Sequence, residues 1–154
     1  MASRLEYVKR FSDLEVYERQ RALSREVFRV TADFPSEEKF SLTDQIRRSS
    51  RSIGAQIAEA WAKRRYPKHF ISKLTDADGE QLETQHWLTE AFNCGYLSDQ
   101  DQQQSIDLCL EIGRMLGSMI HKADAFSSEN CTLKDEAIPY LTTNSSDVGV
   151  FSDH

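Results

Sequence analysis

Apolar residues recur with a helical period along most of the chain. The first stripe has spacings of seven, four, three and four residues and consists of Val16, Leu23, Val27, Val30 and Phe34. Such spacing places apolar side chains on one face of an α-helix. Ser12 and Glu15 form a capping-box pattern that predicts the helix start near Ser12, and Pro35 predicts its end.

Three further helices follow from the same pattern. The second is expected to start at Ser41 and to end around Arg65–Tyr66, and its stripe is Leu42, Ile46, Ile53, Ile57 and Ala60. The third begins at Pro67, which suits a first helical position, ends at Gly95 and carries Phe70, Leu74, Ala77, Leu88 and Phe92. The fourth runs from a cap at Ser98 to about Phe126.

These segments predict an all-α fold, an up-and-down four-helix bundle. Short connections favour antiparallel neighbours. We expect residues 1–10 to be a flexible N-terminus, residues 11–126 the bundle and residues 127–154 a flexible C-terminal tail. Within the third helix, Gln81 and Gln85 fall inside the apolar stripe and predict a buried polar layer.

The fourth helix has more apolar residues than one face can hold. At 100° per residue, Ile106, Cys109, Gly113, Gly117 and Ile120 form a face that we assign to the core. Leu108, Ile112, Met115 and Met119 form the opposite face of this helix. Together with Trp87, an outward indole on the third helix, they predict an oligomer interface. The alternative is that loops or the tail cover this face.

Composition places the chain among soluble proteins of one domain. It has 154 residues, of which 39% are hydrophobic and 29% charged. The longest apolar run is three residues, so we expect no transmembrane helix, and the N-terminus has no secretory signal pattern. Cys94, Cys109 and Cys131 are odd in number and are expected to be free thiols. A cytoplasmic location follows as an expectation.

Charge is divided unevenly along the chain. Residues 1–73 hold 16 Lys/Arg and 10 Asp/Glu, a net charge of +6, whereas residues 74–154 hold 3 and 15, a net charge of −12. Eight cations in the second helix and the turn after it are RNA-binding candidates: Arg47, Arg48, Arg51, Lys63, Arg64, Arg65, Lys68 and Lys73. Convergent cations suit RNA phosphates, but ion pairs with acidic side chains would explain them equally well.

Enzyme signatures are weak. A di-iron bundle needs two Glu-x-x-His motifs, and the sequence has one, Glu83 to His86. There is no nucleophile elbow, P-loop or dinucleotide fingerprint. We therefore expect no catalytic activity, no cofactor and no metal site, with a bundle metalloenzyme as the least favoured alternative.

An ordered set of short motifs carries a family resemblance over about residues 11–125. The motifs are Phe11–Tyr17, Phe34–Pro35, Leu42–Ser49, Ser52–Ile53, Ile57–Ala60 and Gly95–Leu97. They resemble the four-helix-bundle proteins encoded in intervening sequences of 23S ribosomal RNA genes, and equally the related accessory protein of diversity-generating retroelements. Gln56 and Ala60 replace the Asn and Gly that are usual there.

The resemblance implies a bacterial homopentameric ring without established catalytic activity. For the accessory-protein branch it also implies a basic surface that engages nucleic acid and a reverse transcriptase. We expect a cytoplasmic, non-enzymatic oligomer that contacts RNA or an RNA-associated protein through its basic segment. The alternative is a ring that serves only structure or protein interaction, without nucleic acid.

Overall fold

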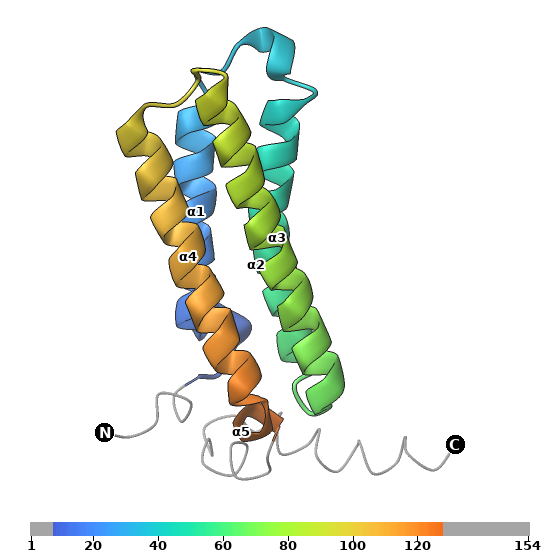
Figure 1. The fold of residues 1–154 in the computed structure, drawn as a ribbon. Helices are drawn as coiled ribbons and strands as arrows, with labels where there is room; N and C mark the ends of the chain where they lie inside the picture. The colour runs from blue at the N-terminus through green and yellow to red at the C-terminus, as the bar shows by residue number, and fades with distance from the viewer. Residues whose placement is uncertain (1–7, 128–154) are drawn as a thin grey trace.

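Four long helices pack up and down in the computed structural model, which describes residues 8–127 (Figure 1). The main helices are α1 (Glu15–Thr31), α2 (Leu42–Ala62), α3 (Pro67–Asn93) and α4 (Asp99–His121). Short elements are the 3₁₀ turns η2 (Phe11–Asp13) and η3 (Ser36–Glu38) and the final helix α5 (Ala123–Ser127). Each main helix contacts its two neighbours in the order α1, α2, α3, α4 and back to α1. The all-α, up-and-down prediction is confirmed for this part of the chain.

The ends of α3 and α4 follow local sequence signals. Pro67 occupies the first position of α3, and Gly95 has a φ of 79°, which favours glycine directly after the helix. The Ser98 hydroxyl accepts a hydrogen bond from the Asp101 backbone N–H at 3.1 Å and caps α4. These predicted boundaries are confirmed.

Three other predicted boundaries are wrong. Ser12 lies in a 3₁₀ turn, and α1 starts later, at Glu15. The second helix ends at Ala62 rather than near Tyr66. The fourth helix ends at His121, and the single residue Lys122 separates it from α5. Pattern reasoning extends helices through such turns because apolar spacing continues across them.

The side chain that caps α2 belongs to Glu38, which precedes the predicted start of the helix at Ser41. Ser41 is the N-cap residue, yet its hydroxyl donates to the Glu38 carboxylate at 2.6 Å. The same carboxylate accepts the Leu42 backbone N–H at 3.2 Å and the Tyr96 hydroxyl at 3.3 Å. These hydrogen bonds, that of Ser41 above all, lower the pKa of Glu38. Glu38 therefore ties η3, α2 and the α3–α4 connection together.

Polar side chains lie within the core where two glycines leave room for them. Gln20 is buried and donates to the Ser50 carbonyl at 3.0 Å, and a Cβ at Gly54 would lie 2.5 Å from its Oε1. Gln81 is buried beside Gly113 and accepts from Gln85 Nε2 at 2.7 Å. The predicted burial of Gln81 is confirmed, whereas Gln85 is half-buried and Gln20 was not predicted. These polar contacts favour one register of α1 on α2 and of α3 on α4.

The remaining sequence predictions meet the structure only in part. Every helix among residues 8–127 is too short or too polar to span a bilayer. Residues 1–7 and 128–154 lie outside the described part, so the predicted flexible tail and most of the predicted flexible N-terminus lie there too, as does Cys131. Cys94 and Cys109 are free thiols, and burial raises the pKa of Cys109 to about 12.

Candidate nucleic-acid interface

Arg47 lies on the outer side of the contact between α1 and α2. Its Nε donates to the Thr31 hydroxyl at 2.8 Å, and its guanidinium carbon lies 4.7 Å from the centroid of the Phe28 ring. Phe28 itself is 54% exposed. The arginine is thus held flat against an aromatic ring at the surface, where a cation and a ring stabilise each other.

A shallow groove of about 600 Å³ continues from Arg47 along the start of α2. Its lining consists of Lys39, Phe40, Thr43, Asp44, Arg47, Arg48, Arg51, Ser52 and Ala55. Four of these side chains are cationic and one, Asp44, is acidic. Arg51 follows Arg47 by one helical turn, is exposed, and has no ion-pair partner among residues 8–127.

Two arginines of α1 extend this surface and were missed by the sequence analysis. Arg21 and Arg25 are exposed, share the helical flank of Phe28 and have no ion-pair partner among the described residues. The hydrogen bond of Gln20 to Ser50 and the stacking of Arg47 on Phe28 bring this flank beside α2. Arg21, Arg25 and Phe28 are spaced by four and three residues, and this helical spacing in the sequence could have placed the two arginines on one flank. The α1–α2 cationic face, as we name it, consists of Arg21, Arg25, Lys39, Arg47 and Arg51.

Arg48 lines the groove but forms an ion pair with Glu83 of α3. Its Nη2 lies 3.0 Å from Glu83 Oε1, which also accepts the Trp87 indole N–H at 3.1 Å. Burial and the neighbouring Glu83 raise the pKa of Glu80 at the same contact. This network joins α2 to α3, and Arg48 is therefore less available to a ligand than Arg51.

The other predicted cations lie at the far end of α2, at the turn into α3 (Figure 1). Arg64 is buried: it donates to the Trp61 carbonyl at 2.9 Å and stacks on the Trp61 ring at 4.3 Å. Lys73 pairs with Glu59 at 2.8 Å, which raises the pKa of Lys73 and lowers that of Glu59.

The rest of the turn is more open. Lys63 and Lys68 are exposed, and Arg65 is half-buried. A 21-residue α2 spans about 30 Å. The eight predicted cations therefore form two separate groups, not one continuous segment.

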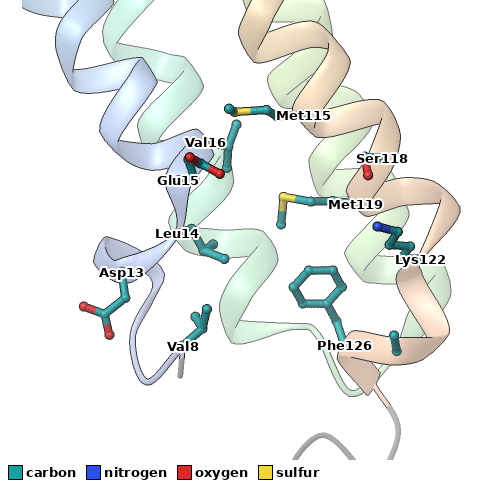
Figure 2. Close-up of a pocket in the computed structure, with 11 residues that line it drawn as sticks. Val8, Asp13, Leu14, Glu15, Val16, Met115, Ser118, Met119, Lys122 and Phe126 are labelled. Atoms are coloured by element: carbon teal, nitrogen blue, oxygen red, sulfur yellow. The ribbon is translucent and has the colours of Figure 1, made fainter. Parts of the chain in front are cut away.

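The predicted oligomer face of α4 is wrong for Ile112 and Met119. Ile112 is 0% exposed and Met119 is buried, both within the core. Figure 2 shows Met115 and Met119 directed toward Val16, Leu14 and Phe126, where they line a pocket of about 410 Å³ at the end of the bundle. The wheel of α4 contains apolar residues on several sides, and the positions of α1 and α3 decide which side is buried.

The other two α4 candidates and the indole of α3 also contact the chain's own core. Leu108 and Met115 are half-buried against it, and so is Trp87, whose indole N–H is satisfied by Glu83. Trp87 is therefore not the outward indole that the sequence suggested.

A different apolar surface lies on the outer side of α3 and α4. Leu82 is 54% exposed and Leu110 is 43% exposed. They lie on the flanks where these helices meet, because Gln81 of α3 approaches Gly113 of α4. The α3–α4 apolar strip, as we name it, consists of Leu82, Ile106, Leu110, Gly113, Gly117 and Ile120. Ile106 and Ile120, which the sequence analysis assigned to the core, are half-buried at its edge.

The single Glu-x-x-His motif does not form a metal-binding cluster in the described residues. Glu83 is engaged with Arg48 and Trp87, and the His86 ring is exposed, 4.7 Å from the Trp87 ring. Residues 8–127 contain no group of three or more His, Cys, Asp or Glu side chains that could hold a metal ion.

Comparisons with known proteins agree with this architecture. The family described as 23S rRNA-intervening sequence protein matches residues 12–118. Among solved structures, the chain is similar to a protein of unknown function from the S23 ribosomal protein family of Bacteroides thetaiotaomicron. The two are 29% identical, the match covers 69% of this chain and 95% of that chain, and the TM-score is 0.62. No curated protein matches the chain. Because the family match spans more than half of its length, the chain belongs to the 23S rRNA-intervening sequence protein family.

Proposed function

We propose that this protein is a non-enzymatic RNA-binding protein that contacts RNA phosphates through the α1–α2 cationic face. The observation that carries the proposal is the exposure of Arg21, Arg25 and Arg51 without acidic partners among residues 8–127, although the chain as a whole has a net charge of −6. Arg29, by contrast, pairs with Glu26 and Asp101. Unpaired arginines on one face supply the counterion release that drives binding to phosphate backbones.

Removing three of these charges tests the proposal. In the triple variant Arg21→Gln, Arg25→Gln, Arg51→Gln we expect RNA affinity at low salt to fall about ten- to a hundredfold. The slope of log K against log[salt] should become shallower by about 2, since each lost phosphate contact on a single strand removes about 0.7. Fluorescence anisotropy with a labelled RNA over a salt series measures both quantities.

A matched variant removes the same charge from elsewhere in the molecule. Lys63, Lys68 and Arg114 are exposed and lie away from the cationic face. Their replacement by Gln should leave most of the affinity and the salt slope intact. Equal losses in the two triple variants would refute a localised site, and wild-type protein that binds no RNA at low salt would refute the function itself.

We also propose that copies of the chain associate through the α3–α4 apolar strip. The family resemblance implies a pentamer, and in such a ring the strip of one copy would meet a different surface of the next copy. Two exposed leucines and two glycines on one flank support this, because burying their apolar surface between copies would oppose the repulsion between chains that each carry a net charge of −6. If only this proposal holds, the protein is an interaction ring without nucleic acid.

Charges placed in the strip should separate the copies. We expect the double variant Leu82→Asp, Leu110→Asp to stay helical and to shift the mass in light scattering to that of the 17.7 kDa monomer. Phe28→Asp, Tyr66→Asp is the matched control, since it alters two side chains of similar exposure on other faces and should leave the mass unchanged. A wild-type mass of 17.7 kDa would contradict self-association, and an unchanged mass in the strip variant would contradict this interface.

A further inference from the structure

Phe40 is the most exposed large apolar side chain in the described part of the chain. Its ring is 87% exposed at the junction of η3 and α2, outside the core. The Lys39 ammonium lies 5.4 Å from the ring centroid. Exposing a phenylalanine forfeits the hydrophobic free energy that its burial would provide, so this position does not serve the stability of the single bundle.

A second aromatic platform lies on the same face. Phe28 is 54% exposed and is paired with the Arg47 guanidinium. The groove that begins at Phe40 includes Arg47 and continues to Arg51. Exposed rings and cations therefore share one surface, which is the combination that proteins use to bind single-stranded nucleic acid.

We infer that the ligand of the α1–α2 cationic face is single-stranded RNA, with an unpaired base stacked on Phe40 and a second base on the Phe28–Arg47 pair. This inference rests on the RNA-binding function proposed above. The π-faces of bases within a duplex are already covered by their neighbours, so a duplex would meet this surface through its phosphates alone. Asp44 is the acidic side chain in the groove lining, and Lys39, Arg47 and Arg51 outweigh it, so the net charge still favours a phosphate backbone.

The test compares one labelled RNA of about 15 nucleotides, free of self-pairing, with the same strand annealed to its complement. We expect Phe40→Ala to weaken binding of the single strand about five- to a hundredfold and to leave duplex affinity unchanged, because one stacked base is lost. Phe40→Trp should retain single-strand affinity. Tyr66→Ala is the matched control: its ring is 51% exposed at the opposite end of α2, and its loss should change neither affinity.

The outcomes separate this inference from the function beneath it. If single strand and duplex bind equally and Phe40→Ala changes neither affinity, the inference is overturned while charge-driven RNA binding stands. If neither RNA binds, both fail. A thermal unfolding curve equal to that of the wild type ensures that Phe40→Ala reports on binding, as expected for a ring outside the core.

Discussion

Replacing Ile112 with aspartate is expected to unfold the bundle rather than to separate its copies. The side chain is 0% exposed, and the variant would bury a carboxylate with no partner among apolar neighbours. Truncation to alanine alone should lower the free energy of unfolding by about 2–5 kcal/mol, a large part of the stability of an ordinary domain. Far-UV circular dichroism during heating measures the loss.

Leu110→Asp is the control for this experiment. Leu110 is two residues away on the same helix but 43% exposed, so its replacement should preserve helical content. If Ile112→Asp instead gave a fully helical protein of lower mass, Ile112 would lie at a contact between copies, and the assignment of the faces of α4 would be wrong.

Phe70→Ala is expected to cause the largest stability loss of any single truncation to alanine in the described core. Phe70 is 0% exposed and is the largest fully buried side chain there. The centroid of its ring lies 5.3 Å from that of the Phe126 ring of α5. Removing a buried phenylalanine costs about 3–5 kcal/mol through lost transfer free energy and the cavity that remains. Urea denaturation should show a lower midpoint with an unchanged slope.

Phe40→Ala makes the same chemical change at a surface position. Since Phe40 is 87% exposed, the urea midpoint of this variant should equal that of the wild type within error. A loss below about 1 kcal/mol for Phe70→Ala would contradict the packing of α5 against α3.

The two proposed surfaces lie on opposite sides of the bundle. One is formed by α1 and α2 and the other by α3 and α4, and the helices contact one another around the bundle in the order α1, α2, α3, α4 and back to α1. If the α3–α4 apolar strip meets a surface other than the cationic face of the next copy, every cationic face stays accessible. An oligomer would then present several identical RNA sites, and simultaneous contacts along one RNA would raise the overall affinity above that of one copy.

The number and order of the four main helices follow from sequence patterns alone. Pro67, Gly95 and Ser98 each impose a backbone geometry or a hydrogen bond that depends only on near neighbours. Leu23, Ile53 and Leu74 are likewise buried as expected, because helical period alone groups each of them with the other apolar residues on one face. Boundaries failed where a turn interrupts the helical pattern although apolar residues continue across it, as after Ala62 and His121.

Which face of α4 is buried, and which cations have no acidic partner among residues 8–127, depends on how the helices pack together. Ile112 and Leu110 are both apolar and two positions apart, and only the placement of α1 and α3 puts the first inside and the second outside. Arg48 and Arg51 are equally basic, but Glu83 of α3 meets only Arg48. Burial and ion pairing depend on residues that are distant in the chain, and helical periodicity carries no information about which helices become neighbours.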